Sequence, residues 1–285
     1  MNLCRYQHIN RFAIAAAVLF VLLLSCLVLF AYDNISNPLP DSPKQKYRLI
    51  FREDFNGDTL DLKHWRKIPR NVKVAWSACL SDHSSLYDIS DGRLRLYARE
   101  NTGVNSGDTA KYLLGGVETK NMVGVTYGKV EVRARMTGAQ GVVSAIWLVA
   151  TKPKPYPDYM ELDILEHINE RMTADQTVHN NYIDKLGFKD KPLYQVKPQV
   201  NYLKYNTYAV EVLPDRVIFS INGRNTLVYP RIETQHAGQF PFGSGELFLR
   251  LNMEAGYNKW LRDVDLSKFP VYMDIDWVKF YDVAL

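Results

Sequence analysis

Downstream of Tyr47, apolar and polar positions alternate in short runs with a period of two residues. This is the period of a β-strand, in which successive side chains point to opposite faces of a sheet. No long stretch beyond Tyr32 shows the 3.6-residue apolar period of a helix. Turn sequences separate the runs, as in SDGR (90–93) and GSGE (243–246). Strands are therefore predicted at 93–98, 128–136, 142–150, 207–213, 216–221, 245–252 and 271–281.

Asn222-Gly223 lies between two of these runs and predicts a β-hairpin, because both residues tolerate the positive φ angles of a tight turn. Many short strands without an internal repeat favour an all-β fold, a β-jelly-roll sandwich of two antiparallel sheets with a concave substrate cleft. The strand at 128–136 carries Glu131, Arg133 and Arg135 on one face. This face is either a solvated outer surface or part of the cleft, and one strand alone does not decide.

A long apolar run precedes the β-rich region. Residues 12–32 carry no charge, and this length allows a helix to span a bilayer. Arg5 and Arg11 precede the run, so the positive-inside rule places residues 1–11 in the cytoplasm and the rest of the chain outside. An uncleaved signal anchor fits the length best. A cleaved signal peptide and a lipoprotein signal ending at Cys26 are the alternatives.

All three interpretations export the rest of the chain to the cell envelope, either membrane-anchored in the periplasm or at the cell surface, or secreted. Residues 33–47 are polar, contain prolines and are predicted to be a linker. The domain that carries the function is then expected at 48–285.

The amino-acid composition favours some classes of function and argues against others. The 18 Tyr, 12 Phe and 5 Trp favour β structure and suit carbohydrate binding, because apolar sugar faces stack on aromatic rings. The net charge of +4 comes without a long Lys/Arg block, which argues against nucleic-acid binding. Cys79 stands alone after the N-terminal segment, so the domain has no disulfide framework, and no Cys/His cluster has zinc-ligand spacing.

The sequence MELDILEH (160–167) places three carboxylates in an apolar run. Glu161 and Asp163 share a face of a strand, whereas Glu166, three residues further on, would point to the other face. A β-bulge inserts one unpaired residue and would return Glu166 to the face of the other acids. A bulge is therefore predicted between Asp163 and Glu166.

The bulge sets the distance between the two glutamates. Four strand steps span about 13 Å at roughly 3.3 Å per step, and each side chain reaches about 4 Å toward the other. The remaining gap of about 5 Å is that of a retaining glycosidase, since an inverting enzyme needs room for a water molecule. Like charges this close raise at least one pKa, which leaves one acid protonated as general acid and another free as nucleophile. Calcium binding is an alternative, but the Asp/Asn/Gly-rich loop typical of calcium sites is missing.

The chain resembles glycoside hydrolase family 16, which includes laminarinases, agarases and carrageenases. ELDILE (161–166) matches the longer, bulged form of the family motif E-[ILV]-D-x-(x)-E. Further similar segments follow in the family's order from about Leu49 to Tyr281, among them IFREDFNGDTLDLKHW (50–65), QTVHNNY (176–182) and FLRLNMEAGYNKW (248–260). The resemblance implies a jelly-roll fold and retaining hydrolysis of a β-glycan.

The resemblance also implies roles for individual residues. Glu161 would be the nucleophile, Glu166 the acid/base, and Asp163 the residue that tunes the nucleophile. The implied substrate contacts are Trp147, His179, Tyr156, Asn71, Trp76, Arg133 and Trp260. Trp65 and Trp277 are assigned to the core. No cofactor is required and no metal site is assigned, while a structural calcium ion, which many relatives hold, stays open.

Two segments depart from the family. Tyr156–Met160 replaces Trp-Pro-x-x-Gly before the first glutamate, and EAGYNKW (254–260) replaces a Gly-Gly-x-Trp segment. These changes leave the acids in place and alter the surroundings of the substrate.

The sequence thus predicts an endo-acting, retaining β-glycoside hydrolase that cleaves a polysaccharide by double displacement, with laminarin-like β-1,3-glucan as first substrate. A β-galactan or poly-N-acetyllactosamine hydrolase is one alternative. A non-catalytic glycan-binding protein on the same scaffold is another, although the presence of both Glu161 and Glu166 favours an enzyme. A monomer is expected, which meets the membrane through its N-terminal segment and does not bind nucleic acid.

Overall fold

The computed structural model describes residues 46–103, 108–259 and 261–283. The predicted cytoplasmic segment, the signal anchor or signal peptide and most of the linker lie outside these residues. Within the described ranges, no helix is both long enough and apolar enough to cross a bilayer. The first described strand begins at Tyr47, one residue before the predicted start of the domain.

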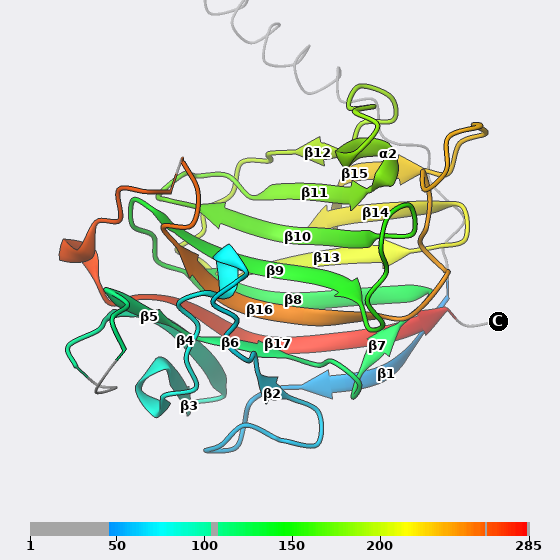
Figure 1. The fold of residues 1–285 in the computed structure, drawn as a ribbon. Helices are drawn as coiled ribbons and strands as arrows, with labels where there is room; N and C mark the ends of the chain where they lie inside the picture. The colour runs from blue at the N-terminus through cyan, green and yellow to red at the C-terminus, as the bar shows by residue number, and fades with distance from the viewer. Residues whose placement is uncertain (1–45, 104–107, 260, 284–285) are drawn as a thin grey trace, which may run out of the picture. The chain divides into compact units, whose positions relative to one another are not determined.

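The described strands form two antiparallel sheets that pack face to face (Figure 1), which confirms the predicted all-β jelly-roll sandwich. One sheet has nine strands in the order β15–β14–β13–β8–β17–β4–β3, with β1 paired to β17 and β5 paired to β4. Its strands are β1 (Tyr47–Glu53), β3 (Tyr87–Ser90), β4 (Arg93–Glu100), β5 (Tyr112–Leu114), β8 (Gly128–Met136), β13 (Asn206–Val212), β14 (Arg216–Ile221), β15 (Arg224–Pro230) and β17 (Val271–Val283).

The other sheet has eight described strands in the order β12–β11–β10–β9–β16–β6–β2, with β7 paired to β16. They are β2 (Arg66–Lys67), β6 (Gly116–Glu118), β7 (Gly124–Val125), β9 (Val142–Ala150), β10 (Met160–Ile168), β11 (Asp175–Asn180), β12 (Gln195–Val196) and β16 (Leu247–Ala255). The short helical turns are η1 (Ala75–Ser77), η2 (Ser84–Leu86), α2 (Asn181–Asp184) and η3 (Leu266–Lys268).

The alternating residues of both sheets enclose the hydrophobic core. On β8, Val130, Val132 and Ala134 are fully buried, and the polar residues between them are not. Removing each valine side chain from water stabilises the fold by about 1.5–3 kcal/mol, and the smaller Ala134 contributes less. The predicted hairpin is also confirmed, because Asn222 and Gly223 connect β14 to β15 with φ angles of 51° and 76°.

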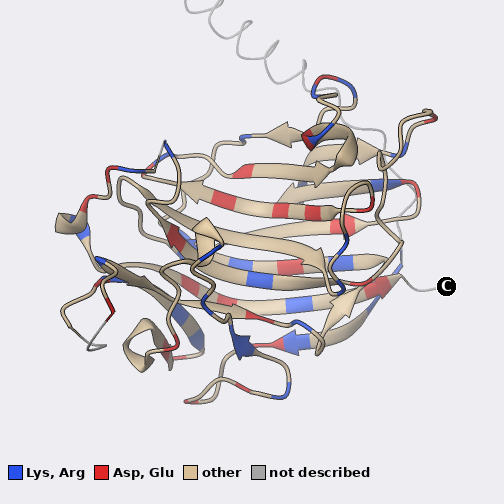
Figure 2. Ribbon diagram, in the orientation of Figure 1, with Lys and Arg blue, Asp and Glu red and all other residues tan. Residues whose placement is uncertain are grey.

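The outer face of the nine-stranded sheet holds the second set of β8 residues. Arg133 pairs with Asp276 there, and its guanidinium lies 4.7 Å from the ring of Tyr205. The prediction that Arg133 contacts sugar in the cleft is therefore wrong. Its strand, β8, belongs to the nine-stranded sheet, whereas the strand with the three acids belongs to the other sheet. Because Val132 and Ala134 point inward, the side chain of Arg133 faces solvent. Basic positions, Lys or Arg, lie along β4 and β8 in Figure 2.

Trp277 also lies outside the core. The register of β17 against β8 shifts between Ile275 and Trp277, which brings Trp277 opposite Arg133 on the outer face. Trp277 is half-buried, and the ammonium group of Lys279 lies 4.0 Å from its ring. Trp65, by contrast, is fully buried as predicted.

Asp274 is the buried anchor of this outer face. It is fully buried on β17 and accepts hydrogen bonds from Arg95 (2.5 and 2.9 Å) and Arg135 (3.0 Å). We expect Asp274→Ala to lower the free energy of unfolding by about 2 kcal/mol, because it leaves two arginines without their carboxylate. The control Asp276→Ala removes a half-exposed partner and should cost less than about 1 kcal/mol. Urea unfolding measures both, and equal losses would contradict the assignment.

Candidate active site

The acidic strand β10 contains the predicted bulge. Three steps from Asp163 to Glu166 on β10 oppose two steps from Thr177 to Asp175 on β11. Against β9, Asp163 pairs with Trp147 and Leu165 with Ile146, so Ile164 is the extra residue. Both Ile164 and Leu165 are fully buried in the core. The bulge therefore sends two consecutive apolar residues inward and returns Glu166 to the face of the other acids.

All three carboxylates line one open pocket of about 470 Å³ on the eight-stranded sheet. Acidic positions follow one another along β10 in Figure 2. Other strands and loops contribute Trp76, Trp147, Tyr159, His179, Lys189, Gln195, Glu254 and Tyr257, among others. The bulge thus places Glu161, Asp163 and Glu166 together as the sequence predicts.

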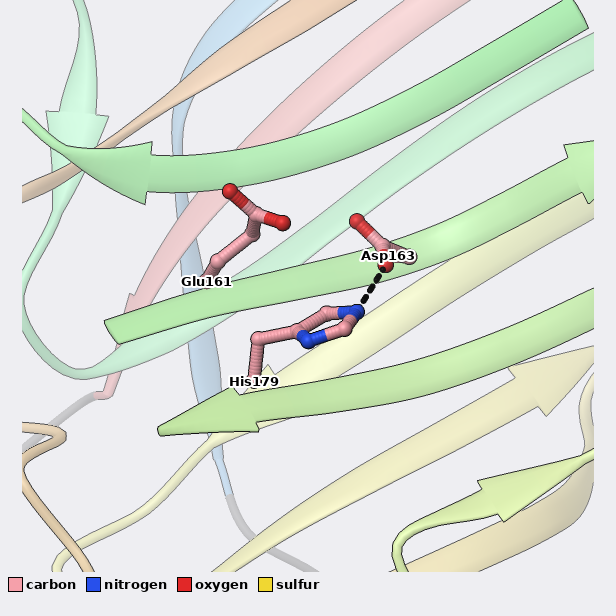
Figure 3. A group of neighbouring side chains, drawn as sticks. All are labelled: Glu161, Asp163 and His179. Carbon is pink, nitrogen blue, oxygen red and sulfur yellow. Dashed lines mark ion pairs between the residues drawn. The ribbon is translucent and has the colours of Figure 1, made fainter. Parts of the chain in front are cut away.

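His179 reaches Asp163 from the neighbouring strand β11 (Figure 3). Its Nε2 lies 3.1 Å from Asp163 Oδ2, and its Nδ1 lies 3.0 Å from Asp184 Oδ1. Burial lowers the pKa of this imidazole. The hydrogen bonds to the two aspartates and the charges of Asp163 and Glu161 outweigh burial and raise the pKa to about 11. His179 is therefore a cation that partly neutralises the acid cluster.

Tyr159 holds the carboxylate of Glu161. Its hydroxyl donates a hydrogen bond to Glu161 Oε2 from two residues away on the chain. Burial, followed by the charge of Asp163, raises the pKa of Glu161 to about 7, and His179 and the Tyr159 hydroxyl oppose that rise. The carboxylate is thus fixed in place, and its charge is favoured by two neighbours.

Glu166 is the more strongly perturbed glutamate. Burial raises its pKa to about 9, and the charges of Asp163 and Glu254 add to the effect. Burial likewise raises the pKa of Glu254, on β16, to about 7. Burial and like charge thus favour the protonated form more strongly in Glu166 than in Glu161.

Two tryptophans form the apolar wall of the pocket. Trp147 on β9 is only 7% exposed and donates a hydrogen bond from Nε1 to Asn252 Oδ1 (2.7 Å). Asn252 in turn donates to Glu254 (3.0 Å). Trp76, from η1, meets Trp147 edge to face, with ring centroids 5.2 Å apart. Trp147 and Trp76 therefore lie in the pocket as predicted, whereas their contact with a sugar stays a prediction.

The other predicted contacts lie elsewhere. Tyr156 is exposed and donates a hydrogen bond to Asp184 (3.1 Å), the same residue that binds His179, so it stands near the site without lining the pocket. Asn71 is exposed in the loop before η1, where its side chain accepts from the Lys73 amide, and it does not line the pocket. Trp260 lies outside the described residues.

Tyr159, Glu254 and Tyr257 line the pocket without having been predicted. A signal for Glu254 is present in the sequence. Apolar and polar residues alternate over 249–255, so Arg250, Asn252 and Glu254 share the face opposite to the buried leucines. The pattern shows a shared face but does not say that this face adjoins β10.

Glu161, Asp163 and His179 form the one group of close potential metal ligands among residues 46–103, 108–259 and 261–283. A protonated imidazole offers no lone pair to a metal, and calcium takes six to eight oxygen ligands. The group therefore does not fit a calcium site. A structural calcium ion elsewhere stays a prediction.

A two-sheet jelly roll with three close carboxylates beside an edge-to-face pair of tryptophans is typical of a carbohydrate-active protein. The family model for glycosyl hydrolases family 16 matches residues 77–279, and the chain belongs to this family.

Three known proteins illustrate the likeness. The keratan-sulfate endo-1,4-beta-galactosidase of Sphingobacterium multivorum is 29% identical over 93% of this chain and 66% of its own length. The laminarinase from Rhodothermus marinus superposes with a TM-score of 0.73 at 21% identity, over 85% of this chain and all of that one. A structure from work on endo-acting O-glycanases of the human gut microbiota that initiate mucin breakdown gives 0.71 at 24% identity, over 83% and 100%. The chain spans 66% or less of the lengths of the first curated relatives that it matches.

Deleting Ile164 tests the bulge. The deletion leaves Glu161, Asp163 and Glu166 in strict alternation, so all three keep their face and the strand stays paired. We expect a cooperative thermal transition with a stability loss of about 3 kcal/mol for the missing buried side chain. Deleting Leu162 instead turns Glu161 toward the core and should abolish cooperative unfolding. If calorimetry shows the same outcome for both deletions, the register assignment is wrong.

Glu254→Gln tests the electrostatics of Glu166. Glu254 is charged above about pH 7, where it opposes ionisation of Glu166. Removing this charge should move the alkaline limb of the pH profile of kcat/KM to lower pH. A buried carboxyl whose pKa is higher in the folded than in the unfolded state also destabilises the fold as pH rises from the unfolded pKa through the folded pKa. The variant, which lacks the Glu254 carboxyl, should therefore be more stable than the unchanged protein above pH 7. The control Glu246→Gln, at an exposed carboxyl outside the pocket, should leave the profile unchanged.

Proposed function

We propose that this chain is an endo-acting, retaining hydrolase of β-linked glycans. The observation that carries the proposal is the bulge on β10, which brings Glu161 and Glu166 to one face of the pocket with Asp163 between them. The higher pKa of Glu166 supports the division into acid and nucleophile.

In the first step, ionised Glu161 attacks the anomeric carbon of the bound sugar while Glu166 gives its proton to the departing glycosidic oxygen. A covalent glycosyl-enzyme forms, and the leaving chain departs as an alcohol. In the second step, Glu166, now ionised, takes a proton from water, and the resulting oxygen nucleophile displaces Glu161 from the sugar. Both glutamates return to their starting protonation.

The neighbours of the two glutamates have distinct tasks in this proposal. Tyr159 fixes Glu161 by its hydrogen bond. Asp163, bound to the His179 cation, raises the pKa of Glu166 and so keeps its proton available. Trp147 and Trp76 offer apolar surfaces for the sugar faces.

For the substrate, the 29% identical galactosidase favours a β-galactoside within a poly-N-acetyllactosamine-type chain. Similarity to the O-glycanase structure is compatible with this choice. The β-1,3-glucan that the sequence placed first is the second candidate, supported by the likeness to laminarinases, which concerns the fold. Export through the N-terminal segment and a monomeric state belong to the proposal as expectations from the sequence.

A glycan panel tests the substrate. The full chain is incubated with unsulfated poly-N-acetyllactosamine, agarose and laminarin, and product sizes are read by mass spectrometry. We expect oligosaccharides from poly-N-acetyllactosamine and a much slower reaction with laminarin. Cleavage of laminarin alone would overturn the galactoside assignment, and no cleavage of any β-glycan would overturn the hydrolase assignment.

Two substitutions test the mechanism. Glu161→Gln and Glu166→Gln should each lower kcat by about 10³-fold or more, because each removes a group that the reaction requires. Glu246→Gln is the matched control and should keep the rate of the unchanged protein. Nuclear magnetic resonance of the first product should show the β-anomer; an initial α-anomer would contradict retention.

A further inference from the structure

A second hollow of about 260 Å³ adjoins the active-site pocket. It shares Trp76, Trp147, Tyr159 and Glu161 with that pocket, but Glu166 does not line it. Beyond the tryptophans, its wall carries three cationic side chains, Lys120, Lys154 and Arg250. The described residues thus build a basic compartment directly beside an acidic one.

Arg250 is held firmly on β16. Its guanidinium carbon lies 4.7 Å from the ring of Trp147, 5.1 Å from that of Trp76 and 5.0 Å from that of Phe248. Its Nε donates to Glu118 Oε2 (2.8 Å). Within the part of the chain that the structure describes, its terminal nitrogens make no hydrogen bond, so they are available to a ligand.

The two lysines approach from separate loops, after β6 and between β9 and β10. The Lys154 ammonium donates to the backbone oxygen of Ser244 (3.2 Å), which carries no charge. The Lys120 ammonium lies 5.7 Å from the ring of Phe248. Neither forms a salt bridge with a described carboxylate, and both are only partly exposed.

The nearby carboxylates do not balance these cations. Glu118 is 1% exposed and binds two cations, because it also accepts a hydrogen bond from Arg66 Nε at Oε1 (2.8 Å). Glu246 lies beside Lys154 in an adjoining hollow and accepts a hydrogen bond from Thr151. Glu161 is the nucleophile of the proposed reaction. A hollow with aromatic walls and an excess of positive charge attracts an oxyanion, and charge-assisted hydrogen bonds to Lys and Arg are strong.

We infer that this hollow is a subsite for an anionic substituent of the glycan, a sulfate ester or a sugar carboxylate. The inference rests on the proposed function. Because the hollow adjoins Glu161 and not Glu166, the charged sugar belongs to the glycone, the part of the substrate that becomes bonded to Glu161. Trp76 and Trp147 carry the sugar ring, and Lys120, Lys154 and Arg250 bind its charged group.

Binding measurements with a non-turnover protein test the subsite. The full chain with Glu166→Gln is titrated calorimetrically with two sets of matched oligosaccharides. The poly-N-acetyllactosamine set contains a neutral, a 6-O-sulfated and a sialylated ligand. The laminarin set is the same, except that a uronic acid replaces sialic acid. We expect at least one anionic ligand to bind about tenfold or more tightly than its neutral counterpart. The sulfated and carboxylated arms show which group is recognised.

The double variant Lys120→Met/Lys154→Met should lower this preference several-fold, since only Arg250 of the three cations remains, and leave the Kd of the neutral ligands unchanged. Lys111→Met/Lys152→Met is the control with equal loss of charge at exposed lysines outside the hollow, and it should keep the preference. Equal Kd values for neutral and anionic ligands, or a preference that is undiminished in the first variant, would overturn the subsite. If the preference is present but the unchanged chain cleaves no β-glycan, the proposed hydrolysis fails and the subsite stands.

Discussion

The bulge at Ile164 is the constraint on which the rest of the site depends. The core side of β10 requires the apolar pair Ile164 and Leu165 inside, and the pocket side requires Glu166 beside Asp163. A regular strand cannot meet both demands with this sequence, because its side chains alternate strictly. One unpaired residue reconciles them, and the neighbouring strands β9 and β11 keep their pairing on either side of it. Packing energy thus holds the carboxylates in a cluster that their own repulsion opposes.

The cluster survives because its charges are compensated unequally. His179, held between Asp163 and Asp184, supplies a positive charge at one end, and Tyr159 supplies a hydrogen bond to Glu161. Burial dominates at Glu166 and raises its pKa, and the charge of His179 opposes that rise. The same strand therefore carries two carboxyls whose ionisation is opposed to different degrees, less at Glu161 than at Glu166. The raised pKa values lower the stability of the folded protein at alkaline pH, because these carboxyls ionise more easily in the unfolded chain than in the fold.

The sequence predicts local geometry better than long-range pairing. Alternation and turn chemistry are local, so they predict the Asn222-Gly223 hairpin and the bulge in β10. They also show that Glu131, Arg133 and Arg135 share a face, but which sheet takes that strand depends on pairing with β13 and β17. The same limit hides Glu254, whose relation to Glu166 arises only when β16 pairs with β9. Tyr159 was missed because its hydroxyl contact depends on the path of a loop, which no period describes.

The tryptophan pair separates two electrostatic environments within a few side chains. Asp163 and Glu166 line only the acidic pocket, and Glu161 lines both hollows. Arg250 lines only the basic hollow, where it lies over both rings and is bonded to Glu118. An arginine placed against aromatic faces keeps its charge close to the pocket while its Nε partner fixes its direction. Because Lys120 and Lys154 come from loops and the acids from paired strands, substitutions in the basic compartment leave the register of β10 untouched. In the proposed function, the two lysines that would bind a charged sugar and the acids that would cleave the bond therefore come from different elements of the fold, and the lysines can change while the acids are kept.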